Sequence, residues 1–427
     1  MLATLPSLQI KPIEHPLNAT VRVPGSKSLT NRALLIGALA DGKTRLTNAL
    51  FSDDSSYFAR ALQTLGFDVE LDEHKREMVV TGLGGKVPAA EAELFIGNAG
   101  TAARFLSAFL TLGNGEFILD GDERMRERPI GDLVTALHQL GVELNATDNC
   151  PPVKIAARGL LGGKTKIAGN ISSQFLSALL MVAPYAKTPI EIELTTDLNS
   201  KPYVDMTVAI MKDFGIDIER RDYSIFTIHP STYSPLSSYK IESDASAASY
   251  FFAAPAICGG NIRIENISRN SKQGDLAFLD VLQEMGCQIV DGENYIEVKS
   301  MQNLQGIEVD MRDIPDTAQT LAAIAPFASS PTRIRGIASA RQKETDRIHA
   351  TCTELARLGV AVEEHEDGMT IYPCEKFNRA TIQTYNDHRM AMAFSLIGLR
   401  FNGVTIENPS CVSKTFPNYF EVLDSLS

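Results

Sequence analysis

The sequence lacks any long apolar run that could cross a membrane. Nowhere do 18 or more apolar residues follow one another without interruption. The N-terminus also lacks the charged stretch and long apolar core of a secretory signal peptide. We therefore expect a soluble protein that stays in the cytoplasm and has no membrane partner.

Cysteines are few, and they show no pairing pattern. The six are scattered along the chain: Cys150, Cys258, Cys287, Cys352, Cys374 and Cys411. None forms a CxxC pair, and none is spaced with histidines as zinc ligands are. This usage is typical of a reduced cytosolic chain, so we predict neither disulfides nor a metal site.

Basic residues are in the minority, with 40 Lys and Arg against 52 Asp and Glu and a net charge of −12. This balance argues against a broad nucleic-acid-binding surface, and any basic site must be local. The 427 residues are 44% hydrophobic and 22% charged, which is ordinary for a globular protein and too long for one small module.

A pattern of roughly 72 residues repeats six times along the chain. Each copy contains a short alternating segment that predicts a strand, at 44–50, 116–121, 190–196, 261–267, 332–337 and 404–409. In five copies an amphipathic run follows and stops at a glycine, which predicts a helix end: Gly66, Gly141, Gly215, Gly286 and Gly359. A predicted hairpin and a second helix complete the copy.

The second helix of each copy is almost entirely apolar beyond its first turn, which predicts burial on all sides. These helices are expected to begin near 26, 98, 172, 244, 315 and 387. Four cations lie in or just after three of the first turns: Lys27, Arg32, Arg104 and Arg389. A cation there opposes the helix dipole, and a bound phosphate or carboxylate would resolve the conflict. We therefore predict anion sites at these helix starts.

The six copies divide most simply into two domains of three copies each. We expect an N-terminal domain at 25–240 and a C-terminal domain made of 1–24 and 241–427. Hinges are expected near 22–25 and near 230–244, where the chain is rich in Ser, Pro and Tyr. The cleft between the two domains is the expected ligand site.

One motif points to a different class of protein. The segment GALADGKT at 37–44 matches the phosphate-binding loop of nucleotide-binding proteins. Such a loop follows a strand and opens a helix, whereas here the predicted helix comes first and the predicted strand second. We interpret the segment as a helix end and a turn.

Several motifs together resemble those of the 5-enolpyruvylshikimate-3-phosphate synthase family, over essentially the whole chain. They occur in the family's order and include PGSKSLTNRALL, GNAGTAAR, SSQFLSALLM, IPDTAQT, KETDRI and YNDHRMAM. The resemblance implies a two-domain inside-out α/β barrel, each domain having three βαβαββ repeats with buried helices. It also implies transfer of the enolpyruvyl group of phosphoenolpyruvate to the 5-hydroxyl of shikimate 3-phosphate, with release of phosphate and no cofactor, by a monomer.

The resemblance also implies two sets of binding residues. Those expected to bind shikimate 3-phosphate are Lys27, Ser28, Arg32, Ser172, Ser173, Gln174, Ser200, Tyr203, Asp316, Ser339 and Lys343. Those expected to bind phosphoenolpyruvate are Lys27, Asn98, Gly100, Arg128, Gln174, Arg347, Arg389 and Lys414. We expect Glu344 to protonate the methylene carbon, Asp316 to act as the base for the hydroxyl, and Lys27 to stabilise charge.

The sequence departs from the family pattern at two positions. Ser339 stands where many members have asparagine, and Phe105 stands where the usual residue is proline. Gly100 keeps the small residue on which inhibition by glyphosate depends in the family, so we expect this chain to be sensitive.

Two other functions remain open at this stage. The first is enolpyruvyl transfer to UDP-N-acetylglucosamine, whose enzymes usually carry a reactive cysteine in the loop corresponding to 121–131. Here no cysteine precedes Cys150. The second is a non-catalytic anion-binding scaffold, which would have no need for Lys27, Asp316 and Glu344 together.

Overall fold

The computed structural model describes residues 5–300 and 303–426 and divides into two compact units. Unit 1 combines the chain up to Pro24 with the chain from Glu242 onward, and unit 2 spans Gly25–Ile241. The chain therefore passes from one unit to the other twice, after Pro24 and after Ile241. Each unit has its own hydrophobic core.

Unit 2 contains three copies of the repeat in sequence order. The first comprises α1 (Lys27–Leu39), β3 (Asp41–Thr47), α2 (Asp53–Thr64), β4 (Asp68–Asp72) and β5 (Glu77–Leu83). The second comprises β6 (Glu91–Phe95), α3 (Gly100–Leu110), β7 (Asn114–Asp120), the 3-10 helix η2 (Met125–Glu127), α4 (Gly131–Gln139), β8 (Glu143–Thr147) and β9 (Cys150–Arg158). The third comprises β10 (Gly163–Ile167), α5 (Ser173–Val182), η3 (Ala183–Tyr185), β11 (Ile190–Leu194), α6 (Lys201–Asp213), β12 (Glu219–Arg221), β13 (Ile225–Ile228) and β14 (Tyr239–Lys240).

Each copy in unit 2 forms a four-stranded sheet with the same pairing. In the second copy the order is β6-β7-β9-β8, with β6 parallel to β7 and the other pairs antiparallel. The first sheet obtains its parallel edge strand from the end of the unit, because Tyr239 of β14 lies opposite Leu46 of β3. This pairing ties the end of unit 2 back to its beginning.

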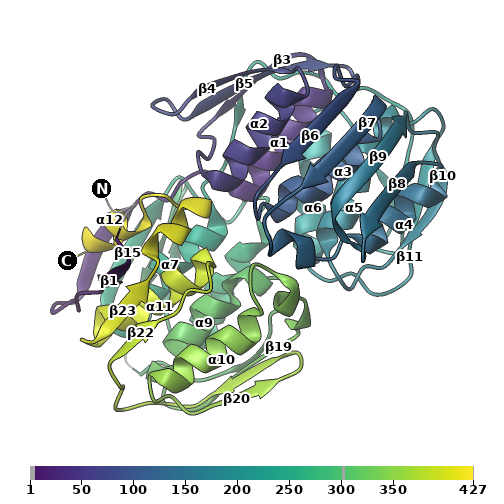
Figure 1. Ribbon diagram of the computed structural model, residues 1–427. Coiled ribbons are helices and arrows are strands. Elements are labelled where there is room, and N and C mark those ends of the chain that lie inside the picture. Colours follow the sequence, from purple (N-terminus) through teal and green to yellow (C-terminus); the bar gives the residue numbers. More distant parts are fainter. Residues whose placement is uncertain (1–4, 301–302, 427) are drawn as a thin grey trace. The chain divides into compact units, whose positions relative to one another are not determined.

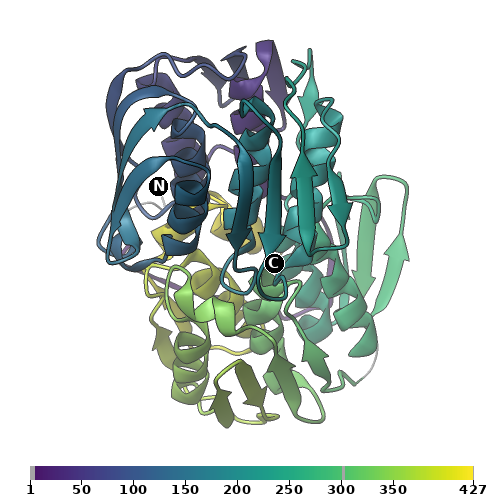
Figure 2. The same ribbon diagram turned by 90° about the vertical axis from the view of Figure 1, so that its right-hand side faces the viewer.

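The second helices of the repeats are buried inside unit 2, as predicted. Every residue of α3 is buried, and so is every residue of α1 beyond its first two. Figure 1 shows α1, α3 and α5 lying behind or between strands of this unit, and Figure 2 shows the strands from another side. Helices α1, α3 and α5 have no acidic residue in their first turns, so nothing on those turns offsets the positive end of the dipole.

Unit 1 repeats this architecture with help from the N-terminal segment, except that its last sheet has three strands among the described residues instead of four. Strands β1 (Ser7–Gln9) and β2 (Leu17–Val21) join it; β2 runs parallel to β15 (Gly260–Glu265), and β1 runs antiparallel to β23 (Val404–Glu407). Its buried helices are α7 (Ala245–Cys258), α9 (Ala318–Ile324) and α11 (His388–Arg400).

The remaining elements of unit 1 form the sheets and the outer helices. The helices are η4 (Gly274–Ala277), α8 (Phe278–Glu284), η5 (Pro315–Thr317), η6 (Ala325–Phe327), η7 (Ala338–Gln342), α10 (Arg347–Arg357), η8 (Pro409–Lys414) and α12 (Tyr419–Asp424). The strands are β16 (Gln288–Asp291), β17 (Tyr295–Lys299), β18 (Glu308–Asp310), β19 (Thr332–Arg335), β20 (Val362–His365), β21 (Gly368–Ile371) and β22 (Ala380–Ile382).

The predicted helix ends are confirmed at all five glycines. Each follows the cap of an outer helix and has a positive φ, from 81° to 106°: Gly66, Gly141, Gly215, Gly286 and Gly359. This left-handed conformation favours glycine because a side chain would clash there.

The reversed order at 37–44 is also confirmed, since α1 ends at Leu39 and β3 begins at Asp41. Across the residues that the structure describes, no helix has the length and apolar character needed to span a membrane.

Candidate active site

Unit 1 gathers a buried ionic network around the guanidinium of Arg347, the first residue of α10. Its Nη1 donates to Oδ1 of Asp316 at 3.0 Å, and its Nη2 donates to Oε2 of Glu344 at 2.8 Å. Its Nε donates to Oδ2 of Asp387 at 2.8 Å. One cation therefore places the two expected catalytic carboxylates, Asp316 and Glu344, on neighbouring nitrogens of the same plane.

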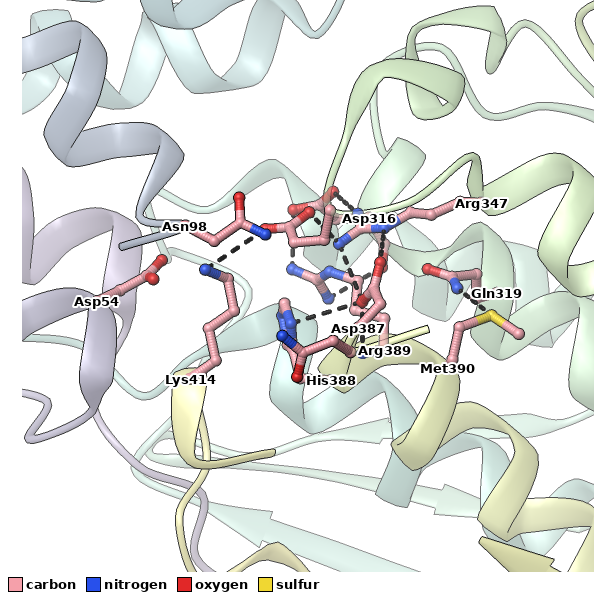
Figure 3. Close-up of polar contacts among 12 residues, drawn as sticks. Asp54, Asn98, Asp316, Gln319, Arg347, Asp387, His388, Arg389, Met390 and Lys414 are labelled. Atoms are coloured by element: carbon pink, nitrogen blue, oxygen red, sulfur yellow. Dashed lines mark hydrogen bonds and ion pairs between the residues drawn. The ribbon is translucent and has the colours of Figure 1, made fainter. Parts of the chain in front are cut away.

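Two further cations border this network. Arg389 Nη2 donates to Oδ2 of Asp316 at 2.8 Å, and its Nη1 donates to the Asp316 carbonyl oxygen at 3.0 Å. The Nζ of Lys414 lies 3.9 Å from Oε1 of Glu344. Figure 3 shows Asp316, Arg347, Asp387 and Arg389 turned toward one another. The negative charges of three carboxylates thus compensate the positive charges of three cations: Asp316, Glu344 and Asp387 compensate Arg347, Arg389 and Lys414.

Burial makes this network electrostatically strong. The side chain of Arg347 is 4% exposed and that of Asp387 is 0% exposed. Burial alone lowers the pKa of Arg347, but the carboxylates of Asp387, Glu344 and Asp316 raise it above its ordinary value. Arg347 therefore stays protonated, and an incoming anion would compete with these carboxylates for its N–H groups.

Local sequence explains why these side chains meet. Asp387 is the N-cap of α11, and its Oδ1 accepts from the backbone N–H of Arg389 at 2.9 Å. The same carboxylate holds Arg347, so one residue fixes the starts of both α10 and α11. Sequence reasoning did not include Asp387 in the site. Its position at a helix start immediately before His388 and Arg389 was the signal that could have found it.

Unit 2 holds the other expected residues at the starts of its buried helices. Lys27 is the first residue of α1, and its Nζ lies 3.4 Å from Oδ2 of Asp54 on α2. Asp54 is 2% exposed and was also absent from the sequence prediction. Pairing with this buried carboxylate keeps the ammonium group of Lys27 at the positive end of α1, where the dipole alone would repel it.

Arg32 lies one turn further along α1 and is buried. Its Nε donates to Oγ1 of Thr207 at 2.7 Å, and its Nη1 donates to the Ser28 carbonyl oxygen at 3.1 Å. Its Nη2 donates to Ser177 and to the Tyr203 carbonyl oxygen. Among the residues that the structure describes, no carboxylate lies within ion-pair distance of it. Burial lowers the pKa of Arg32 to about 10, so the group still carries its charge at neutral pH.

The loop before α3 is fixed by Arg128, which follows η2. Its Nη1 donates to Oδ1 of Asn98 at 2.8 Å and to the Asn98 carbonyl oxygen at 3.2 Å. A Cβ added at Gly100 would lie 2.4 Å from Nη2 of Arg128. Glycine at the start of α3 therefore makes room for the guanidinium.

The remaining expected residues occupy helix starts and turns. In unit 2, Ser172 caps α5, its Oγ accepts from the backbone N–H of Gln174 at 3.3 Å, and Ser173 is buried. Ser200 precedes α6 with a positive φ of 58°, and Tyr203 lies in the first turn of that helix. In unit 1, Ser339 lies in η7 and Lys343 directly follows that helix; both are partly exposed.

The structure thus brings the expected residues into two groups. Unit 1 brings together Asp316, Glu344, Arg347, Arg389 and Lys414. In unit 2, Arg128 hydrogen-bonds Asn98 and lies against Gly100. In the same unit, Arg32 donates to the carbonyl oxygens of Ser28 and Tyr203. Within the described residues, no group of three or more His, Cys, Asp and Glu side chains is placed to hold a metal ion.

Repeated βαβαββ units, with cations in the first turns of the buried helices α1 and α11, are the architecture expected of the enolpyruvyl transferase class. The family model described as EPSP synthase (3-phosphoshikimate 1-carboxyvinyltransferase) matches residues 12–423. The chain therefore belongs to the EPSP synthase family.

Curated relatives agree with this assignment. A 3-phosphoshikimate 1-carboxyvinyltransferase of Trichormus variabilis is 50% identical over 416 residues, which cover 97% of each chain. One from Sulfurovum sp. is 49% identical over 425 residues, which cover 99% of each chain.

Among solved structures, an EPSP synthase from Acinetobacter baumannii superposes with a TM-score of 0.82 at 25% identity, covering 99% of this chain and 98% of the other. The expected fold class and enolpyruvyl transfer in the shikimate pathway are confirmed by these findings. Neither alternative function is favoured.

Proposed function

We propose that the chain transfers the enolpyruvyl group of phosphoenolpyruvate to the 5-hydroxyl of shikimate 3-phosphate and releases phosphate. The observation that carries the residue assignment is the guanidinium of Arg347, which hydrogen-bonds Asp316 and Glu344 at once. Two carboxylates held on one cation are well suited to move two protons in one addition step, one to the donor carbon and one from the acceptor hydroxyl.

In the first step, Glu344 in its acid form gives its proton to the terminal methylene carbon of phosphoenolpyruvate. The 5-hydroxyl oxygen forms a bond to the adjacent carbon while its proton passes to Asp316. The product is a tetrahedral adduct that carries a methyl group. A phosphate that draws Arg347 and Lys414 away from Glu344 favours the protonated acid, because the carboxylate then loses its cationic partners.

In the second step, the adduct loses a proton from its methyl group as the carbon–oxygen bond to phosphate breaks. The enolpyruvyl ether and phosphate are the products, and the proton that Asp316 took from the hydroxyl leaves with the phosphate. We assign the returning proton to Glu344, because it delivered that proton in the first step. Lys27 stabilises negative charge on the oxygens that gain it.

Binding residues are assigned by the resemblance to the family. The residues assigned to phosphoenolpyruvate are Lys27, Asn98, Gly100, Arg128 and Gln174 of unit 2 and Arg347, Arg389 and Lys414 of unit 1. The residues assigned to shikimate 3-phosphate are Lys27, Ser28, Arg32, Ser172, Ser173, Gln174, Ser200, Tyr203, Asp316, Ser339 and Lys343. Arginine can bind a carboxylate or phosphate with two parallel hydrogen bonds, which lysine cannot.

Glu344→Gln tests the catalytic assignment. The amide keeps the size of the side chain but has no carboxyl proton to give, so phosphate release should fall at least a hundredfold while calorimetry shows shikimate 3-phosphate binding within threefold of wild type. Unchanged turnover would remove Glu344 from the mechanism. The same phosphate-release assay with UDP-N-acetylglucosamine should show no reaction.

We further propose that the chain works as a monomer in the cytoplasm. The absence of any disulfide among its six cysteines supports a reducing compartment. Light scattering on a sizing column should give a mass near 46.5 kDa, and a mass of twice that would contradict the proposal.

A further inference from the structure

A fully buried carboxylate lies outside the ionic network around Arg347. It contacts the turn that carries Asp387, a member of that network. Glu354 on α10 is 0% exposed. Its Oε1 accepts from the hydroxyl of Tyr385 at 2.8 Å, and its Oε2 accepts from the backbone N–H of Gln383 at 3.2 Å. Arg357 supplies charge compensation at 3.4 Å. Buried charge is costly unless it is hydrogen-bonded, and here the donors come from the segment just before Asp387.

That segment adopts an unfavourable backbone conformation. The backbone N–H of Asp387 donates to the carbonyl oxygen of Thr384 at 2.8 Å, closing a four-residue turn. The two central residues, Tyr385 and Asn386, have φ values of 53° and 54°. Positive φ at both central positions is typical of a type I′ turn, which normally uses Asn and Gly. A tyrosine there is a poor local choice, so its conformation must be held by tertiary contacts.

The contact from Glu354 is one that can hold it. Tyr385 is 36% exposed, so packing alone restrains it weakly, whereas its hydroxyl reaches the buried carboxylate. Burial and the hydrogen bond to Glu354 raise the pKa of Tyr385 to about 12, which keeps the hydroxyl a donor.

Helix α10 contacts the turn at two places. Arg347 and Glu354 are seven residues apart, which is about two helical turns and places them on one face. Arg347 bonds the side chain of Asp387 at the end of the turn, while Glu354 bonds Gln383 and Tyr385 at its beginning. Since Asp387 also caps α11 ahead of Arg389, a shift of the turn would move both arginines of the network.

We propose that Glu354 is a positioning residue for phosphoenolpyruvate binding, acting through the turn 384–387 on Arg347 and Arg389. This inference rests on the proposed assignment of those arginines to phosphoenolpyruvate. Glu354 itself touches no substrate in this account. It sets the conformation from which Asp387 and Arg389 project.

The test uses Glu354→Gln, Tyr385→Phe and the double variant in the full chain. Each single variant should raise the KM for phosphoenolpyruvate about five- to tenfold, while calorimetry of shikimate 3-phosphate alone gives a Kd within twofold of wild type. The KM of the double variant for phosphoenolpyruvate should exceed that of the more impaired single variant by no more than twofold, because both changes alter the same contact. Additive effects, or equal losses for both substrates, would overturn the proposal.

Two reference variants separate positioning from mere stability and from a failure of the proposed function. Leu355→Ala removes a buried apolar side chain of α10 that can form no hydrogen bond to the turn, and should lower Tm while leaving the KM for phosphoenolpyruvate unchanged. A rise in KM equal to that of Glu354→Gln would overturn the proposal.

Arg389→Lys should raise that KM at least tenfold. If Arg389→Lys raises the KM while Glu354→Gln and Tyr385→Phe leave it unchanged, the positioning role of Glu354 is wrong and the assignment of Arg389 to phosphoenolpyruvate stands. If Arg389→Lys also leaves the KM unchanged, the assignment itself is wrong, and the inference fails with it.

Discussion

The guanidinium carbon of Arg32 lies 5.1 Å from the centroid of the Phe105 ring. Both side chains are buried, and the structure shows no acid within ion-pair distance of Arg32 in the part of the chain that it describes. A desolvated cation over an aromatic face gains up to about 2 kcal/mol. The residue that departs from the family pattern at 105 therefore contacts an arginine expected to bind substrate.

Phe105→Leu should test this contact. The substitution removes the ring but keeps an apolar side chain, so the free energy of unfolding should fall by about 3 kcal/mol, part from the cavity and part from the lost cation–π contact. Phe117→Leu, also buried but with no cation over its ring among the described residues, is the matched control and should lose about 1 kcal/mol less. Urea denaturation measures both. Equal losses would show that the ring contributes only volume.

Gly100→Ala should weaken the use of phosphoenolpyruvate. The added methyl group would lie 2.4 Å from an Arg128 nitrogen, so that guanidinium must move away. A displaced arginine costs about 1–3 kcal/mol of binding, so the KM for phosphoenolpyruvate should rise roughly tenfold or more. Steady-state phosphate release measures it. Because Arg32 lies on another helix, the Kd for shikimate 3-phosphate should not change. An equal weakening of shikimate 3-phosphate binding would mean that the substitution disturbs the whole unit.

Asp387→Asn should destabilise the ionic network. The amide still caps α11, but Arg347 loses the full charge of its most buried partner, and breaking such a pair costs about 3 kcal/mol. Chemical denaturation should show this loss, and kcat/KM should fall because Arg347 and Arg389 both depend on Asp387. A stability loss below about 1 kcal/mol would show that Asp316 and Glu344 suffice to hold Arg347.

Asp120 gives the protein a pH-dependent contribution to stability. Its carboxylate bonds Arg126 and the backbone N–H of Gly121, and the bond from Arg126 lowers the pKa of Asp120 below its ordinary value. A lowered folded-state pKa adds stability above the unfolded value of about 4, and that stability is lost as the pH falls through the folded-state pKa.

Asp120→Asn should therefore cost about 1 kcal/mol at pH 7, with the gap from wild type closing as the pH falls below about 4. Urea denaturation at pH 7, 5, 4 and 3 measures it. A gap that stays constant down to pH 3 would mean that the carboxylate charge contributes nothing.

Much of the secondary structure could be predicted from local patterns. The apolar second helices, the alternating strands and the glycines at Gly66, Gly141, Gly215, Gly286 and Gly359 follow from rules that act within a few residues. The cations at helix starts were equally visible, because Lys27 and Arg389 each conflict with a dipole that their own helix creates.

The partners of those cations could not be predicted in the same way. Asp54 lies 27 residues from Lys27, and Asp387 lies 40 residues from Arg347. In the sequence both aspartates look like ordinary residues at helix starts. Only packing shows that each also binds a cation from another helix.

By itself, the sequence determined the repeat, the buried helices and the places where cations meet helix starts, because each depends on the chemistry of neighbouring residues. The tertiary structure alone decided which carboxylate bonds which arginine, why Gly100 leaves room for Arg128, and how Glu354 holds a turn 31 residues away. The physical reason is distance along the chain. Hydrogen bonds and ion pairs act over about 3–4 Å in space, and nothing in the local pattern states which distant residues the fold brings within that range.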